Sequence, residues 1–183
     1  LVERLRNGFP EAKYIDISGL LSADDFYYTD SHWRQERITK VADEIAAQMG
    51  AERIGTCEIQ DTGRPFYGVY YGQAALPHAP ERLFYLDNAV IRGLKVYNVE
   101  TQSDIPVYDL GAAAGRDPYE MFLGGARSII KITNPNAAQE RRLIIFRDSF
   151  GSSIAPLLAA GYSEITLVDI RYISPLSLGK LID

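Results

Sequence analysis

A βαβ pattern in the last third of the chain constrains its fold more than any other feature. The apolar run RLIIF at 142–146 leads into the polar turn RDS, which a helical stretch at 152–162 follows. A second apolar run, EITLVDI at 164–170, comes next. A strand, a turn, a helix and a strand in this order are typical of a parallel sheet covered by helices. The unbroken apolar character of 142–146 further predicts a strand that is buried on both faces.

Other apolar patterns predict further elements. Residues 34–49 have the i, i+3, i+4, i+7 spacing of an amphipathic helix, which Gly50 would end. A short helix is predicted at 1–8, a strand at 12–18, and the start of another helix at 171–183. The remaining predicted strands are IGTCEIQ, ERLFYL, VIRGLKVYNV and RSIIKIT.

The length of 183 residues suits one α/β domain and is short for two. We therefore expect residues 1–183 to form a single domain, with residues 52–125 as an irregular, β-rich insertion. The opening residues, LVERLRNG, look like a helix already under way, which predicts a fragment of a longer chain. One cysteine, Cys57, allows no intramolecular disulfide, and no run approaches the roughly 20 apolar residues of a membrane span. A net charge of −5 with scattered basic residues argues against nucleic acid as a partner.

The turn RDSFGSS places a serine where α/β sheets bind their ligands. Ser149 follows the strand at 142–146 and begins a helix, so its hydroxyl would be exposed at the carboxyl end of a strand. Backbone N–H groups at a helix start favour developing negative charge, as acyl transfer requires. Alternatively, Asp148 or Ser149 only caps the helix, which is a common role for these residue types. As a nucleophile, Ser149 also needs a base, because a serine hydroxyl is weakly reactive at neutral pH.

Only two histidines are available as that base. His78 lies in the proline-flanked turn LPHAP without a nearby carboxylate, whereas His32 lies in TDSHW, two residues after Asp30. An Asp-x-His pair in a loop can place the carboxylate on one imidazole nitrogen and leave the other free for a nucleophile. The alternative is that Asp30 caps the following helix while His32 packs beside Trp33. A metal site is not favoured, because His32 has no second histidine at helical spacing and the chain has no cysteine pair.

Together, the two motifs resemble those of the DHHW proteins and the related alginate O-acetylation proteins of the SGNH hydrolase-like superfamily. FYYTDSHW, the amphipathic helix, YEMFLGGA and the stretch from RLIIF to DIRYI occur in that family's order. The resemblance implies Ser149 as nucleophile, His32 as general base and acid, and Asp30 as the group that orients His32. It also implies an α/β fold with three layers, a mostly parallel sheet flanked by helices. The motif order would be permuted from the usual SGNH enzyme, since Asp30 and His32 precede Ser149.

Three positions depart from the family pattern. Ser31 replaces a histidine of the DHHW motif, Arg147 replaces a glycine before the nucleophile, and Ala126 stands where the family would imply an asparagine. That asparagine would be an oxyanion donor. Arg147 could narrow or charge the site.

The candidates for oxyanion stabilisation are then backbone N–H groups. They belong to Ser149 itself and to Gly124 or Gly125 in FLGGA. Arg171, in DIRYI, could bind an anionic group of the substrate or form an ion pair with a buried aspartate.

These features predict a serine-dependent acyl-ester hydrolase or O-acetyltransferase that acts on a cell-surface or secreted polysaccharide. No metal or organic cofactor is implied, and the acyl donor is not identified. The resemblance implies a location outside the cytoplasm, with room for a membrane-bound acetylation partner or an anchor outside this segment.

Two other interpretations stay open. One is a catalytically inactive domain for glycan binding or assembly that keeps the fold, which Ala126, Arg147 and the tyrosines of FYYTD and FYGVYYG would suit. The other is an α/β domain whose two motifs only cap helices. It predicts that Ser149, His32 and Asp30 lie far apart.

Overall fold

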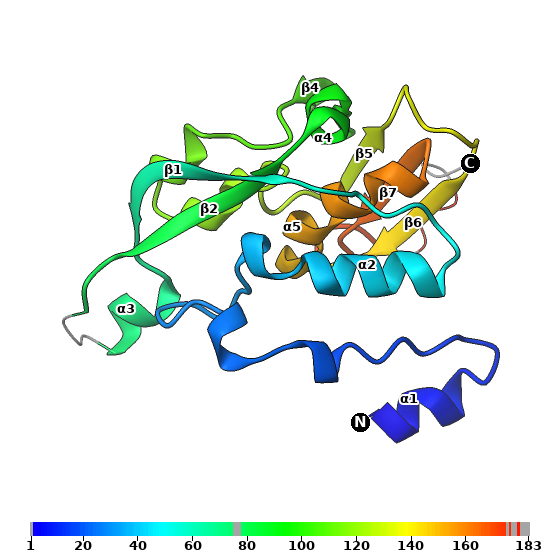
Figure 1. Cartoon of the computed structure of the whole chain (residues 1–183), viewed down its shortest axis with the longest axis horizontal. Coiled ribbons are helices and arrows are strands. Elements are labelled where there is room, and N and C mark those ends of the chain that lie inside the picture. The colour runs from blue at the N-terminus through cyan, green and yellow to red at the C-terminus, as the bar shows by residue number, and fades with distance from the viewer. Residues whose placement is uncertain (1, 75–77, 175, 177–178, 180–183) are drawn as a thin grey trace.

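The computed structural model of the protein describes residues 2–74, 78–174, 176 and 179. Within these residues the chain forms a five-stranded sheet, in the order β4-β3-β5-β7-β6, and a separate sheet of β1 and β2 (Figure 1). The strands are β1 (Glu58–Phe66), β2 (Glu81–Asp87), β3 (Lys95–Asn98), β4 (Ser103–Ile105), β5 (Ile129–Thr133), β6 (Arg142–Phe146) and β7 (Glu164–Val168). The α-helices are α1 (Val2–Gly8), α2 (Thr39–Gln48), α3 (Val69–Ala74), α4 (Ala89–Gly93) and α5 (Ser149–Leu158).

The prediction of a three-layer fold with a mostly parallel sheet is wrong. Of the strand pairs in the larger sheet, β6–β7 is parallel, whereas β3–β4, β3–β5 and β5–β7 are antiparallel. The βαβ pattern correctly gave the direction of the two strands that α5 connects. It holds no information on β3, β4 and β5, which join the sheet without a helical crossover and can therefore run antiparallel.

The expected burial of β6 on both faces is also wrong. β6 is the edge strand of the sheet, and its residues alternate between exposed and half-buried. Ile144 and Phe146 are 47% and 63% exposed. The neighbouring β7 is the strand whose residues 165–168 are fully buried.

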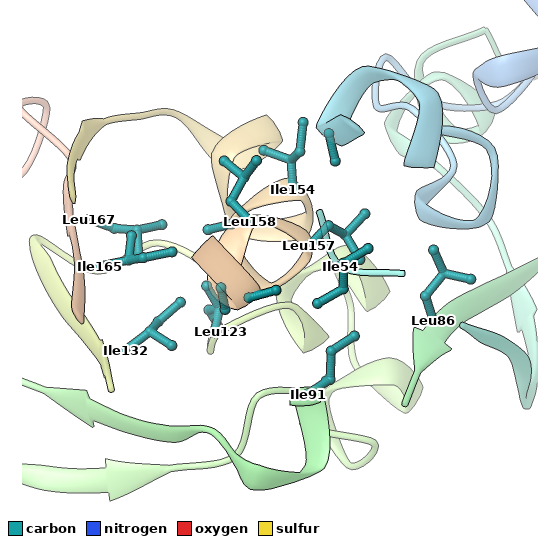
Figure 2. Close-up of a cluster of buried hydrophobic side chains, with 14 of the residues drawn as sticks. Ile54, Leu86, Ile91, Leu123, Ile132, Ile154, Leu157, Leu158, Ile165 and Leu167 are labelled. Carbon is teal, nitrogen blue, oxygen red and sulfur yellow. The ribbon is translucent and has the colours of Figure 1, made fainter. Parts of the chain in front are cut away.

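The core lies where α5 packs against the sheet and against α2. Residues 151–158 of α5 are all buried. Figure 2 shows their side chains meeting those of β2, α4, β5 and β7 in one apolar cluster. The labelled members are Ile54, Leu86, Ile91, Leu123, Ile132, Ile154, Leu157, Leu158, Ile165 and Leu167. This packing fixes the position of the helix that Ser149 begins.

Several local predictions are confirmed and others change. The helix at 1–8 and the strands at β2, β5 and β7 are found, while residues 12–18 contain no strand and follow the outside of α2 (Figure 1). The stretch VIRGLKVYNV splits into α4 and β3, and the strand expected at IGTCEIQ begins only at Glu58. Most of the helix expected at 171–183 lies outside the described residues.

The amphipathic helix begins later than its apolar spacing predicts. Residues 35–37 form a 3₁₀ turn, and α2 itself starts at Thr39. The reason is Gln35, which is fully buried and bonds outside its own helix. Its amide donates to the Ser153 carbonyl at 2.7 Å and accepts from the Leu86 backbone N–H at 2.8 Å. No helix of the described residues is long and apolar enough to cross a membrane.

Candidate functional site

Ser149 is the first residue of α5, and the residue before it caps that helix. Asp148 occupies the N-cap position, and its carboxylate accepts a hydrogen bond of 3.0 Å from the Phe150 backbone N–H. The cap is therefore complete without the Ser149 hydroxyl. The sequence left helix capping and presentation of a serine as alternatives. The turn does both, because Asp148 caps the helix and Ser149 is presented at its start.

The structure brings Ser149, His32 and Asp30 together in one hydrogen-bonded chain. His32 Nε2 lies 2.6 Å from Ser149 Oγ across 117 residues of sequence, and His32 Nδ1 lies 2.5 Å from Asp30 Oδ1. Asp30 is buried, with 4% of its surface exposed. The interpretation that both motifs are unrelated caps, with these residues far apart, is wrong. His78 has no part in this chain and is exposed beside the Ala79 carbonyl.

Asp30 is held as a carboxylate. Burial alone would raise its pKa, but hydrogen bonds from the His32 ring and from the backbone N–H groups of His32 and Val69 outweigh burial and lower the pKa. With Asp30 ionised, the hydrogen is assigned to His32 Nδ1 as donor. Nε2 is then the acceptor for the Ser149 hydroxyl.

Two aromatic rings hold the imidazole between them. The Tyr119 ring stacks on His32 with centroids 3.9 Å apart and an angle of 13°, and the Phe150 ring lies at 5.1 Å. The Tyr119 hydroxyl is bonded to Ser153 Oγ at 2.7 Å, and Trp33 Nε1 donates to the same oxygen at 2.8 Å. Neither Tyr119 nor Ser153 was predicted to be part of the site, although Tyr119 opens YEMFLGGA and Ser153 ends RDSFGSS.

Removing the stacked ring should slow catalysis more than removing its hydroxyl. We expect Tyr119→Leu to lower kcat for an acetyl ester by about 10²-fold, because misplacing a catalytic group by an ångström has that cost. Tyr119→Phe keeps the ring and should lose less than tenfold. Steady-state kinetics of both variants test this, and equal losses would show that stacking does not position His32.

Gly68 brings a second segment against Asp30. The Val69 N–H donates to Asp30 Oδ2 at 2.9 Å, and the Gly68 N–H donates to Thr29 Oγ1 at 3.0 Å. A Cβ on Gly68 would lie 2.2 Å from the Thr29 backbone oxygen. The glycine in FYGVYY was the signal in the sequence for this close approach.

Gly68→Ala should destabilise the fold and the site together. Because the clash is with backbone, we expect about 2–3 kcal/mol lower free energy of unfolding and reduced acetyl-ester turnover. Gly72→Ala is the matched control, since a Cβ there has nothing within 4 Å. Denaturant unfolding of both variants checks the prediction, which fails if the two behave alike.

A cavity of about 240 Å³ opens beside Ser149. Its lining includes Ser149, His32 and Ser152, and also Gly125 and Ala126 of FLGGA. No group of three or more His, Cys, Asp or Glu side chains in the described parts of the chain could hold a metal ion.

Arg147 borders this cavity, is buried and forms hydrogen bonds with protein groups. Its guanidinium donates to Ser152 Oγ at 2.8 Å and to the carbonyls of Gly125 and Arg127 at 3.2 Å. Burial lowers its pKa, against the charge of Asp169 at 3.9 Å. Arg147 thus connects FLGGA to the serine turn, which a glycine at this position could not do.

The FLGGA loop has an unusual backbone. Leu123, Gly124 and Gly125 all have positive φ, at 54°, 69° and 71°. The Gly125 N–H already donates to the Phe122 carbonyl at 3.1 Å. The N–H of Ser149 lies in the first turn of α5, where backbone donors lack helical acceptors, and is therefore the better oxyanion candidate.

Arg171 forms the ion pair that the sequence offered as one of two roles. Its guanidinium binds Asp169 through two hydrogen bonds of 2.8 and 2.6 Å, and Asp169 is fully buried. Arg171 also borders the cavity beside Ser149. The hydrogen bonds from Arg171 outweigh burial and lower the pKa of Asp169.

The Asp169 ion pair should make stability fall at acid pH. A carboxyl with a lowered folded pKa stabilises the fold above its unfolded pKa, and this stabilisation is lost as pH falls through the folded value. We expect Asp169→Asn to cost about 3 kcal/mol at pH 7 and progressively less below about pH 4. Exposed Asp104→Asn is the control in urea titrations. A cost that does not change with pH would contradict the assignment.

Comparison with known proteins supports a family assignment. Solved structures that match are a DHHW family protein from Eubacterium siraeum (TM-score 0.64, 22% identity) and Bacillus cereus PatB1 with a sulfonyl adduct (TM-score 0.65, 20% identity). These matches cover 82% and 93% of this chain, but only 52% and 59% of the two solved chains. No protein in the curated set matches. The family model described as DHHW protein matches residues 20–168. The chain therefore belongs to the DHHW protein family.

Proposed function

We propose that this chain carries a serine-dependent acyl-transfer site that hydrolyses an acyl ester or moves an acetyl group on a polysaccharide. One observation carries the proposal. His32 Nε2 lies 2.6 Å from Ser149 Oγ while Nδ1 lies 2.5 Å from a buried, ionised Asp30. This is the arrangement in which a histidine activates a serine hydroxyl.

In the first half-reaction, Ser149 Oγ attacks the ester carbonyl carbon and His32 Nε2 takes the hydroxyl proton. Asp30 stabilises the imidazolium that forms. The tetrahedral intermediate then breaks its bond to the leaving alcohol, which receives the proton from His32. The acyl group remains on Ser149 as an ester.

In the second half-reaction, water or a sugar hydroxyl attacks this ester. His32 takes the proton of the attacking group and returns it to Ser149 Oγ as the acyl bond breaks. Water gives the free acid, and a sugar hydroxyl gives a new sugar ester. Hydrolase and transferase therefore share the same three residues and differ in what enters the cavity.

Oxyanion stabilisation has two proposed donors in this site. The Ser149 N–H is one, and the Ser152 hydroxyl is the other, because it lines the cavity and its oxygen already accepts from Arg147 at 2.8 Å. With the arginine as donor, the Ser152 hydrogen is available to a ligand. This pair would take the place of the asparagine that the family pattern implies at Ala126.

The comparisons support the chemistry at a coarser level. One of the PatB1 structures holds a sulfonyl adduct. Sulfonyl electrophiles form bonds with activated nucleophiles. We take Ser149 as the corresponding nucleophile of this chain. The proposal also includes a relationship to the alginate O-acetylation proteins, a location outside the cytoplasm and a membrane-bound acetylation partner. They rest on the TDSHW and RDSF motifs.

The test is turnover of an acetyl ester by the purified chain. With 4-nitrophenyl acetate, we expect release of 4-nitrophenol that His32→Ala abolishes and that exposed Ser31→Ala leaves in place. Added polysaccharide separates the two reactions, because a transferase yields an acetylated glycan and a hydrolase yields acetate. A rate that is the same with and without His32 would contradict the proposal.

A second candidate function is glycan binding without turnover. Ala126 and the exposed tyrosines Tyr67 and Tyr70 favour it. In that case polysaccharide would bind equally to the wild type and to Ser149→Ala, and no acetyl ester would be consumed.

A further inference from the structure

Two more hollows continue from the cavity beside Ser149 toward α3. The first, of about 410 Å³, shares Asp117 with that cavity and is lined by Tyr67 and Tyr71. The second, of about 330 Å³, shares Tyr67 and Arg116 with the first and ends at Arg64. We call these two hollows, with Tyr67, Tyr71, Arg116 and Arg64, the distal groove. Most of its lining residues belong to the end of β1, to α3 and to the segment 113–118. Figure 1 shows α3 at the end of the β1–β2 ribbon.

The wall of the distal groove is aromatic. Tyr67 is 42% exposed, and its ring lies 4.7 Å from that of Tyr71. A tyrosine ring offers a flat apolar face for the C–H groups of a sugar and a hydroxyl for its polar groups.

Two arginines without an ion-pair partner among the described residues border the far hollow. Arg64 and Arg116 are both exposed, and the guanidinium of neither has an ion pair or hydrogen bond to the described residues. Arg147 and Arg171, by contrast, are committed to protein groups. The guanidiniums of Arg64 and Arg116 border one hollow, although the chain as a whole has a net charge of −5. Their paired N–H donors favour binding of a carboxylate or a phosphate.

The arginines without a protein partner lie at the far end of the groove. Arg147 and Arg171 border the cavity at Ser149 together with the carboxylates of Asp117 and Glu120, and both of these guanidiniums are bound to protein groups. Arg64 and Arg116 border the far hollow without a partner among the described residues. An anionic group is therefore favoured at the distal end.

We propose that the distal groove binds a polysaccharide, with sugar rings against Tyr67 and an anionic substituent between Arg64 and Arg116. A neighbouring sugar of the same chain then reaches Ser149. The substituent is a carboxylate or a phosphate, which the two arginines bind in the same way. The inference rests on the proposed function only where it places a sugar at Ser149, and binding in the groove can be measured without turnover.

The experiment measures affinity by calorimetry on Ser149→Ala, so that no reaction occurs. The probes are a galacturonic acid hexamer, its neutral methyl ester and a maltohexaose with a terminal phosphate. We expect an anionic probe to bind more tightly than the neutral ester. Arg64→Gln and Arg116→Gln should each weaken that binding by about tenfold or more, which is typical of one lost charged hydrogen bond. Arg53→Gln, an exposed arginine outside these hollows, removes the same charge and should have no such effect.

The tyrosine is tested in the same assay. Tyr67→Ala should weaken binding of the anionic probe, and Tyr67→Phe should restore most of it. Tyr97→Ala, at an exposed position of β3, is the control. Preference for the uronate or the phosphate identifies the substituent.

Equal binding of the charged hexamer and its neutral ester would overturn the inference, as would equal losses in the Arg64 and Arg53 variants or no binding of either anionic probe. These outcomes are independent of the active site. If acetyl-ester turnover is intact but binding does not depend on charge, only the inference about the distal groove is contradicted. If binding depends on charge but no acetyl ester is turned over, only the proposed enzymatic function is contradicted.

Discussion

Ser149→Ala should lower acetyl-ester turnover by about 10⁴-fold or more, since removing the nucleophile of such a triad leaves only the binding and oxyanion contributions. The fold should be nearly unchanged. Asp148 caps α5 through its own carboxylate, so the helix loses no cap with the Ser149 hydroxyl. The expected change in free energy of unfolding is below about 1 kcal/mol.

Two measurements separate this prediction from a general loss of structure. Steady-state kinetics on 4-nitrophenyl acetate give the rate, and denaturant unfolding gives the stability of the same sample. Ser103→Ala, on the exposed strand β4, controls for loss of a serine hydroxyl away from the cavity. A variant without Ser149 that keeps more than about a tenth of the rate would contradict its role as nucleophile.

Asp30→Asn should lower kcat by about 10³- to 10⁴-fold with KM little changed. The carboxylate assigns the hydrogen to His32 Nδ1 and stabilises the imidazolium, and a neutral amide does neither. The amide can also present N–H to His32, which favours the tautomer with its hydrogen on Nε2. That tautomer cannot accept the proton of Ser149.

The stability cost of Asp30→Asn should be modest. The amide oxygen keeps one acceptor for the three donors that now reach the carboxylate, so about 1–2 kcal/mol is expected. Exposed Asp24→Asn is the matched control and should leave both quantities unchanged. Kinetics at several pH values measure the effect. A loss of less than tenfold at every pH would show that Asp30 does not orient the imidazole.

The local part of the fold was open to prediction from sequence, and the arrangement of the sheet was not. RLIIF, RDS and the apolar helix that follows specify β6, the serine turn and α5 because their spacing is a property of neighbouring residues. The antiparallel strands β3, β4 and β5 come from segments that precede this βαβ unit in the chain. Their direction depends on loops at 99–102 and 106–128 that have no periodic pattern.

The candidate site divides in the same way. Ser149, His32 and Asp30 were found because few residues of the chain can perform their chemistry, and two short motifs contain them all. Tyr119 and Ser153 were not found, because a buried tyrosine or serine looks like any other until its partner is known. Arg147 borders the cavity, and its hydrogen bonds to the FLGGA loop could not be predicted from the sequence.

Activation of Ser149 by His32 is tested directly by mass spectrometry of the protein treated with a fluorophosphonate probe. We predict one adduct per chain on the peptide that contains Ser149, none in Ser149→Ala, and labelling slowed by at least about 10²-fold in His32→Ala. An unlabelled Ser149 in the folded wild type, or equal labelling with and without His32, would contradict this activation.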